Sequence, residues 1–135
     1  METSGETRSD VLKKCIFCKL DQHSIVFSSS FFHAIRDSFP VSHLHTLIIP
    51  KRHVETYFDL NEDETTDLAG VLKKARDQIL ELDNSVKAFN IGINAGEESG
   101  QTIFHCHIHL IPRRKDDVED PRGGVRGVIP SKQKY

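Results

Sequence analysis

Three histidines stand at alternate positions in one short segment of the chain: His105, His107 and His109. Successive side chains of a β-strand point to opposite faces, so this spacing predicts a strand over residues 102–111 with three imidazoles on one face. The residues between them, Cys106 and Ile108, are apolar and suit a face that packs on a core. The segment therefore predicts a sheet with one buried face and one face on which the histidines are available for chemistry.

Four other short runs of β-branched and aromatic residues predict further strands: 25–27, 31–35, 46–49 and 88–94. A helix is predicted over residues 62–82, where apolar residues recur at helical spacing. Asn61 is its expected N-cap, with Glu64 three residues later, as in a capping box. Because only one main helix interrupts the strands, we expect an α+β fold. Its sheet is mostly antiparallel with about five strands, and the helix covers one face.

The length and charge of the chain exclude several classes of protein. Its 135 residues, with 18 Lys and Arg against 20 Asp and Glu, predict one near-neutral domain. Three cysteines are an odd number and argue against a disulfide framework, and no apolar run approaches the roughly 18 residues of a membrane span. We therefore expect a soluble protein of the cytoplasm, where thiols stay reduced, with neither a membrane nor a nucleic acid as partner.

Composition divides the chain into three parts. Residues 1–10 are polar and are expected to be disordered, whereas residues 11–112 hold the folded domain. Residues 113–135 carry seven Lys and Arg against four Asp and Glu, together with three glycines and two prolines. This composition predicts an extended basic arm rather than a helix or a central strand. Its arginines are candidates for contacts with a polyphosphate or a second subunit, and a merely solvated arm is the alternative.

The histidines and cysteines point to more than one kind of chemistry. Of eight histidines, six fall in two clusters: His43, His45 and His53, and His105, His107 and His109. A row of imidazoles suits a metal site, and equally suits a catalytic imidazole held in one tautomer by its neighbours. Cys15 and Cys18, spaced as C-x-x-C, form a redox pair, two plain thiols or half of a zinc site. The residues alone leave these alternatives open.

A wider pattern resembles the signature of the histidine triad (HIT) family of nucleotide hydrolases and transferases. Gly-Gln-Thr precedes the three alternating histidines, and the Pro-Arg that follows them is similar to the branch of Hit-type and Fhit-type proteins. Two upstream stretches extend the resemblance, at residues 37–40 (Asp-Ser-Phe-Pro) and 45–53 (His-Thr-Leu-Ile-Ile-Pro-Lys-Arg-His). Together they cover residues 15 to 113, which is most of the chain.

The resemblance implies a role for each matching residue. The middle histidine of the family triad attacks the α-phosphorus of a nucleotide and becomes transiently nucleotidylated, and its match is His107. His109 and His45 match the residues that support this imidazole through hydrogen bonds. Other matches are expected near the phosphate (Thr102, Asn94, Gln101 and Gly100) and at the ribose hydroxyls (Asp37). The base is expected in an apolar slot near the start of the chain: Ile16, Phe17, Phe32 and Ile35.

Several members of this family bind a structural zinc, which implies a second site. Its matching ligands are Cys15, Cys18, His53 and His105, a donor set that suits closed tetrahedral Zn²⁺. In this interpretation His105 is a structural ligand rather than part of the phosphate machinery. No organic cofactor is expected, and the family implies a homodimer paired through the helix and an adjacent strand.

We therefore expect an enzyme that cleaves a nucleoside phosphoanhydride or phosphoramidate through a covalent nucleotidyl-histidine. A diadenosine polyphosphate or an AMP adduct, each carrying a purine nucleotide, is the expected substrate. Neutral imidazole is a good nucleophile near neutral pH, and the sequence has no Gly-rich P-loop. The alternatives are a non-catalytic nucleotide-binding or zinc-containing interaction protein and a catalytic metal centre at the three alternating histidines. Transfer of the nucleotide to an acceptor other than water is also open.

Overall fold

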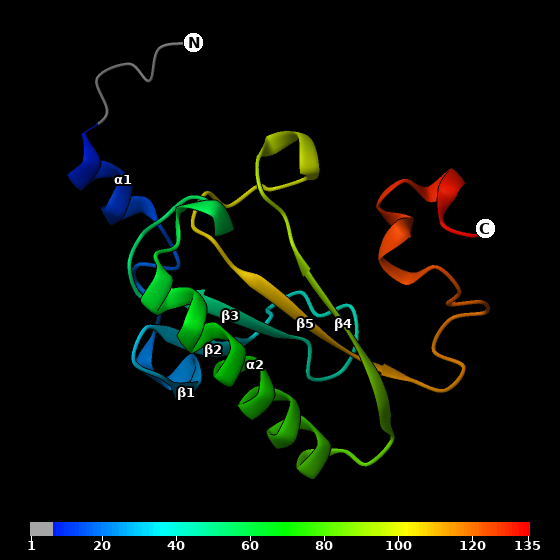
Figure 1. The fold of residues 1–135 in the computed structure, drawn as a ribbon. Helices are drawn as coiled ribbons and strands as arrows, with labels where there is room; N and C mark the ends of the chain where they lie inside the picture. The colour runs from blue at the N-terminus through cyan, green and yellow to red at the C-terminus, as the bar shows by residue number, and fades with distance from the viewer. Residues whose placement is uncertain (1–6) are drawn as a thin grey trace.

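The structure is a computed structural model that describes residues 7–135 (Figure 1). Its helices and strands are α1 (Arg8–Lys14), β1 (Ile25–Ser28), β2 (Phe32–Arg36), β3 (Thr46–Pro50), α2 (Glu62–Leu82), β4 (Val86–Ile93) and β5 (Ile108–Arg114). The strands form one sheet in the order β1-β2-β3-β5-β4, and every neighbouring pair is antiparallel. The predicted α+β fold, with a five-stranded sheet and one main helix, is confirmed.

Helix α2 begins and ends where the sequence predicts, at Glu62 and Leu82. Its first turn is a capping box, because Asn61 Oδ1 accepts from Glu64 N and Glu64 Oε1 accepts from Asn61 N, both at 2.9 Å. The apolar stripe of the helix covers one face of the sheet (Figure 1). The buried residues of this main core are Phe32, Ala34, Ile48, Val54, Leu68, Val71, Ala75, Ile79, Val86, Cys106, Ile108 and Leu110.

The opposite face of the sheet carries the side chain of His109. In the strand register Leu47 pairs with His109, and Ile35 pairs with Leu47, so these three side chains share that face. Phe17, from the loop after α1, joins Leu47, Ile35 and Ile49 in a second, smaller buried cluster. The sheet therefore separates the main core from a face on which side chains of several segments converge.

Strand β5 begins at Ile108, later than the predicted start at residue 102. The residues just before it are bonded to the loop after β3 instead of to a neighbouring strand, since Cys106 N donates to Val54 O at 2.7 Å. The alternation of side chains nevertheless persists, because Cys106 is buried in the main core and His107 stacks edge-on against a ring of the smaller cluster. The predicted strand 102–111 is thus wrong in its first half but right about which side chains share a face.

The start of the chain departs from the predicted boundary. Helix α1 begins at Arg8, and Thr7 and Asp10 form a capping box at its start. Residues 8–10 are therefore helical, although disorder was expected for them, because this local cap stabilises the first turn. Residues 1–6 of the expected disordered segment lie outside the described residues.

The C-terminal arm also differs from the expected extended chain. Strand β5 continues through Pro112 to Arg114, and proline is tolerated there because the pairing with β3 ends at Leu110. The arm, residues 115–135, then folds into short 3₁₀ turns at Gly124–Val128 and Pro130–Lys132 and lies beyond β4 (Figure 1). Gly123 has a φ of 89°, and an added Cβ would collide with the carbonyl of Gln133, so this glycine permits the compact turn.

No helix among residues 7–135 is long and apolar enough to cross a bilayer.

Candidate active site and metal centre

Two clusters of titratable side chains lie close to the start of β5. The first, here called the Asp–His cluster, consists of Asp37, His45, His107 and His109. The second, here called the Cys–His cluster, consists of Cys15, Cys18, His53 and His105. The ring of Phe17 touches both, since its centroid lies 5.1 Å from that of His107 and 5.9 Å from that of His105.

The backbone fixes the tautomer of His45. The Val41 amide donates to His45 Nδ1 at 3.1 Å, so this nitrogen presents its lone pair and the neutral ring carries its proton on Nε2. His45 Nε2 lies 2.9 Å from His109 Nδ1, which therefore accepts. His109 in turn carries its proton on Nε2. One backbone N–H thus sets the direction of two successive imidazoles.

His107 is oriented in the opposite sense. Its Nδ1 lies 2.8 Å from the carbonyl oxygen of His105. A carbonyl only accepts, so Nδ1 carries the proton and Nε2 keeps a free lone pair. The ring centroid lies 5.3 Å from that of His109, so the two imidazoles are neighbours on this face.

Burial and Asp37 act in opposite directions on the two linked imidazoles. Burial lowers the pKa of His45, and the nearby charge of Asp37 partly opposes this effect. Burial also lowers the pKa of His109, as do His107 and His45, again against Asp37. Asp37 Oδ2 lies 3.5 Å from His45 Nε2. Both rings are consequently neutral at neutral pH, which the chain of hydrogen bonds between them requires.

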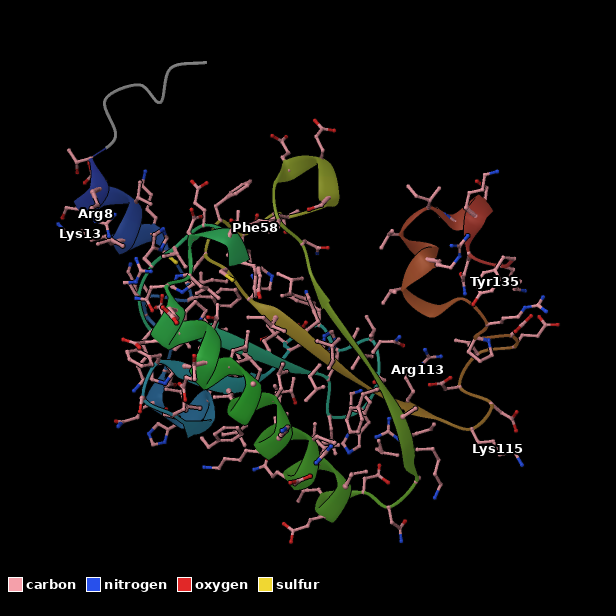
Figure 2. All side chains as sticks on the ribbon, in the orientation of Figure 1. Arg8, Lys13, Phe58, Arg113, Lys115 and Tyr135 are labelled. Carbon is pink, nitrogen blue, oxygen red and sulfur yellow. The ribbon has the colours of Figure 1, made fainter. Side chains whose placement is uncertain are left out.

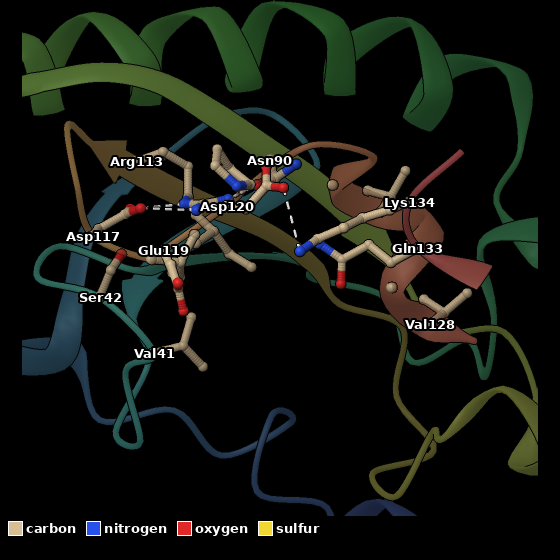
Figure 3. Close-up of a pocket in the computed structure, with 16 residues that line it drawn as sticks. Val41, Ser42, Asn90, Arg113, Asp117, Glu119, Asp120, Val128, Gln133 and Lys134 are labelled. Atoms are coloured by element: carbon tan, nitrogen blue, oxygen red, sulfur yellow. Dashed lines mark hydrogen bonds and ion pairs between the residues drawn. The ribbon is translucent and has the colours of Figure 1, made fainter. Parts of the chain in front are cut away.

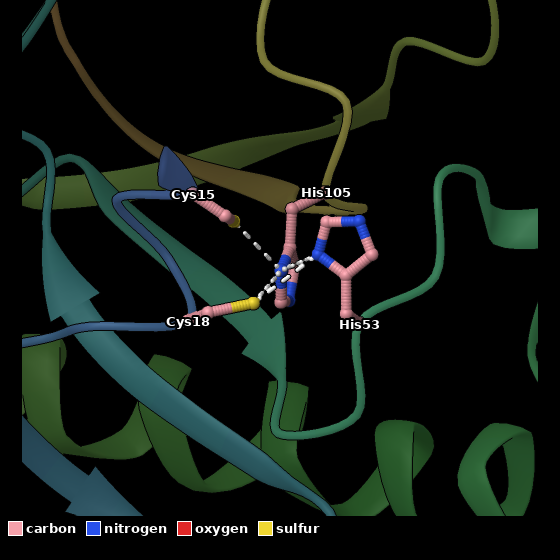
Figure 4. A group of neighbouring side chains, drawn as sticks. All are labelled: Cys15, Cys18, His53 and His105. Carbon is pink, nitrogen blue, oxygen red and sulfur yellow. Dashed lines mark hydrogen bonds between the residues drawn. The ribbon is translucent and has the colours of Figure 1, made fainter. Parts of the chain in front are cut away.

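The Cys–His cluster brings four soft and borderline ligand atoms together (Figure 4). His105 Nδ1 lies 3.3 Å from Cys15 Sγ, 3.5 Å from Cys18 Sγ and 3.1 Å from His53 Nδ1. Cys18 Sγ lies 3.2 Å from His53 Nδ1. Tetrahedral zinc, with bonds of about 2.1 Å to nitrogen and about 2.3 Å to sulfur, places neighbouring ligand atoms roughly 3.3 to 3.8 Å apart. The cluster is therefore of the size that a metal ion needs.

The tautomer of His105 also fits metal binding. Its Nε2 lies 2.8 Å from the carbonyl oxygen of Pro50 and donates to it, which leaves the lone pair of Nδ1 facing the two thiols and His53. A single lone pair accepts from only one of these three neighbours, so a cation satisfies the group better than hydrogen bonds do. Burial, followed by the hydrogen bond with Cys15, raises the pKa of the Cys18 thiol to about 11, so a bound cation has to displace its proton.

Helix α2 anchors the loop that carries His53. Arg52, the preceding residue, forms a forked pair with Glu64, with Nη2 at 2.7 Å from Oε1 and Nε at 3.3 Å from Oε2. Glu64 is only 2% exposed and also accepts from Asn61 N at the start of the helix. The first turn of α2 thus fixes the position of the ligand loop. The capping pattern around Glu64 is visible in the sequence, whereas no sequence signal marks Arg52 as the partner of Glu64.

The structure does not gather the three alternating histidines around one point. His107 Nδ1 donates to a carbonyl, His109 Nδ1 accepts from His45, and His105 Nδ1 faces the thiols. The alternative of a single catalytic metal centre on these three residues is therefore not supported by their geometry. The residues Asp37, His45 and His109 are also close enough to share a metal ion, but the Val41 amide already occupies the His45 Nδ1 lone pair. A metal on Nε2 would then require an imidazolate ring.

Several residues expected at the phosphate have other surroundings. Gln101 is 2% exposed, its Nε2 donates to Glu55 O and Ile103 O, and its Oε1 accepts from Gly96 N, so it ties the loop before β5. Thr102 is exposed and lines a cavity of about 300 Å³ beside the Cys–His cluster.

Three further predicted residues are placed as follows. Gly100 has a φ of 98° and ends a 3₁₀ turn, and Asn94 is half-buried just after β4. Asp37, which was expected at the ribose hydroxyls, lies in the Asp–His cluster beside His45. Of the expected base slot, Phe17 and Ile35 lie on the histidine face, whereas Phe32 belongs to the main core under α2.

Comparison with known proteins agrees with this geometry. Residues 20–116 match the HIT domain. The chain is 42% identical over 81 residues to the bis(5'-nucleosyl)-tetraphosphatase (asymmetrical) of Schizosaccharomyces pombe, which covers 60% of this chain and 44% of that protein. It is 32% identical over 101 residues to a bifunctional bis(5'-adenosyl)-triphosphatase/adenylylsulfatase of Arabidopsis thaliana, covering 75% and 56% of the two chains. The chain thus spans about half the length of these two relatives.

A solved structure adds a comparison of the fold. A zinc-bound histidine triad family protein of Mycobacterium smegmatis superimposes with a TM-score of 0.72 at 29% identity, over 81% of each chain. The match covers most of the present chain, so the likeness in sheet and helix is supported by sequence as well.

Proposed function

Because the chain belongs to the histidine triad family, we propose that it is a nucleotide hydrolase that forms a covalent nucleotidyl-histidine on His107. The observation that carries this proposal is the 2.8 Å hydrogen bond from His107 Nδ1 to the carbonyl of His105, which leaves Nε2 as the nucleophile. The names of the tetraphosphatase of Schizosaccharomyces pombe and the triphosphatase/adenylylsulfatase of Arabidopsis thaliana both describe cleavage of a phosphoryl group attached to a nucleoside. The two names differ in the group that is released. The proposed substrates are therefore a dinucleoside polyphosphate or an adduct of AMP.

The reaction has two displacement steps at the α-phosphorus. In the first, His107 Nε2 forms a bond to phosphorus, and the bond to the leaving group breaks with its electron pair on the leaving group, which takes up a proton from solvent. His109 Nε2–H is placed to donate to the departing atom or to a phosphoryl oxygen, since His45 holds the other nitrogen of that ring. In the second step water attacks phosphorus and loses a proton to solvent, the P–N electron pair returns to His107, and a nucleoside monophosphate leaves.

The same proposal assigns zinc to the Cys–His cluster. Two thiols and two imidazole nitrogens form the donor set that zinc prefers in structural sites, and all four positions are taken by protein side chains. Zinc bound there supplies folding free energy by joining the loop after α1 to the loops before β5 and after β3. Every step at phosphorus is left to the Asp–His cluster.

A homodimer and a cytoplasmic location complete the proposal. Strand β4 lies at an edge of the sheet, and Ile91 on it is 50% exposed. The unpaired backbone groups of an edge strand suit pairing with a second copy of the chain. Sedimentation velocity tests the dimer directly. The reduced thiols that the Cys–His cluster needs fit a reducing compartment.

Replacement of His107 by Ala tests the function. We expect AMP release from diadenosine triphosphate and from adenosine 5'-phosphoramidate to fall by about 10⁴-fold, because the nucleophile is lost, while AMP affinity changes by less than about tenfold. His43→Ala is the matched control, since its side chain is exposed and lies outside both clusters. Turnover that persists in His107→Ala would contradict the covalent mechanism. Binding without turnover in the unmodified protein would favour the non-catalytic alternative.

A further inference from the structure

A large cavity lies between the histidine face of the sheet and the C-terminal arm (Figure 3). Its volume is about 750 Å³, which is in the range that small-molecule ligands occupy. Ile111 and Arg113 of β5 line one wall, and Val118, Glu119 and Val128 of the arm line the other. Figure 2 shows Arg113 on the side of β5 that faces the arm.

The cavity begins where the Asp–His cluster ends. Ile111 and Arg113 follow His109 at alternate positions of β5, so the row of imidazoles continues into the cavity wall at steps of roughly 7 Å. Val41 lines the cavity with its side chain and donates its amide to His45 Nδ1. A molecule held at His107 and extending along this face therefore reaches the arm.

The cations beside the cavity are already engaged. Arg113 pairs with Asp117 at 2.8 Å, and Lys134 pairs with Asp120 at 3.3 Å. Arg126, next to the cavity wall, donates to the carbonyls of Lys132 and Gln133. These arginines thus make intramolecular contacts instead of presenting free charges to a polyphosphate.

One charged group of the wall has no partner within residues 7–135. Glu119 makes no hydrogen bond or ion pair there, and Figure 3 shows its carboxylate directed toward Val41. The neighbouring surface is apolar, because Val118, Val125 and Val128 are 48%, 58% and 79% exposed. The cavity therefore combines an apolar wall with one free negative charge.

From these observations we propose that this cavity is the leaving-group subsite and that it takes a leaving group with an apolar body and a terminal ammonium group. The proposal rests on the proposed function and narrows its substrate class, because a second nucleotide with its phosphates would meet a free carboxylate and no free cation. Apolar contact with the valines supplies binding, and Glu119 selects for the positive charge.

Three substrates with the same AMP half test the subsite: the N-(6-aminohexyl) phosphoramidate of AMP, its N-hexyl analogue and diadenosine tetraphosphate. We expect kcat/KM to be highest for the aminohexyl compound. Glu119→Gln should lower kcat/KM for that compound by about threefold to fivefold, as expected for one exposed ion pair, and should leave the hexyl analogue within about twofold. Glu98→Gln, an exposed change in the turn Glu97–Ser99, is the matched control.

A second variant separates charge from apolar contact. Val128→Ser, which removes apolar contact at an exposed position of the wall without adding a charge, should lower kcat/KM for both phosphoramidates by about fivefold. The subsite is wrong if diadenosine tetraphosphate is the best substrate or if Glu119→Gln affects the two phosphoramidates equally. Absence of turnover of all three substrates by the unmodified protein would overturn the proposed function, and the subsite with it.

Discussion

His105 and His45 lie in neighbouring clusters but have opposite backbone partners. His105 Nε2 donates to a carbonyl, that of Pro50, so its Nδ1 lone pair faces the thiols. His45 Nδ1 accepts from an amide, that of Val41, so its Nε2 is a proton donor. The same side chain thus offers a free nitrogen lone pair in one cluster and a hydrogen-bond donor in the other. A backbone group makes the difference in each case, and three changes test how far this contrast holds.

The largest effect is expected from Cys18→Ser, which removes one ligand of the Cys–His cluster. Loss of a tightly bound ion should cost about 4 kcal/mol of unfolding free energy, the value for a ligand present at roughly a thousand times its dissociation constant. Metal analysis and denaturant unfolding measure the two effects, and turnover per folded molecule should stay within about threefold. Cys106→Ala, which alters the one cysteine outside the Cys–His cluster, should keep the metal and lose only packing in the main core. Equal metal loss in both variants would refute the assigned ligand set.

The second change makes the two clusters more alike. Val41→Pro removes the amide that fixes His45, so the ring is free to place its proton on Nδ1. We expect kcat to fall by about a hundredfold, because a wrong tautomer interrupts the hydrogen bond to His109. The variant should also gain affinity for a metal ion at Asp37, His45 and His109, measurable as a second equivalent of bound Co²⁺. Val41→Ala keeps the amide and should leave both properties unchanged when kcat is measured with adenosine 5'-phosphoramidate, whose leaving group is too small to reach the cavity wall. A similar loss in that variant would mean that the side chain matters instead.

The smallest effect is expected from Asp37→Asn, and it appears in the pH profile. Asp37 raises the pKa of His45 and His109 against the lowering by burial, so its removal lowers both pKa values further. The rings then stay neutral to lower pH, and the acidic limb of kcat should move to lower pH with little change at neutral pH. Ser38→Ala, an exposed neighbour, is the control. A rise in KM without movement of the limb would instead support the ribose contact that the family resemblance implies.

Local signals predicted the fold well where the stabilising contacts are themselves local. Helix α2 begins and ends as predicted because its cap, Asn61 with Glu64, lies within the helix start. The predicted start of strand β5 was wrong because Cys106 N donates to Val54 O, a partner far away in sequence. The prediction of an extended arm was wrong because the Arg126 side chain donates to the carbonyls of Lys132 and Gln133 and folds the segment back on itself, a contact that its glycines and prolines do not reveal.

The candidate site shows the same division. The Cys and His residues of the Cys–His cluster are visible as a pattern and lie together in the structure. The role of Val41 was not predictable, because every residue except proline has an amide and the sequence does not show which one points at His45. The three backbone hydrogen bonds of the Gln101 side chain were likewise not predictable. The Gly-Gln-Thr motif marks the position of Gln101 but does not show which backbone groups surround it.

The arm that closes the cavity contains no buried residue, since every position from 115 to 135 is exposed or half-buried. Segments with so little buried surface open with a smaller free energy than the whole domain, so the arm can detach while the sheet stays folded. Substitutions in it also cost little stability. Under the proposed subsite, a lineage of such proteins is therefore free to change its substrate range through the arm while the Asp–His cluster and the Cys–His cluster stay constant.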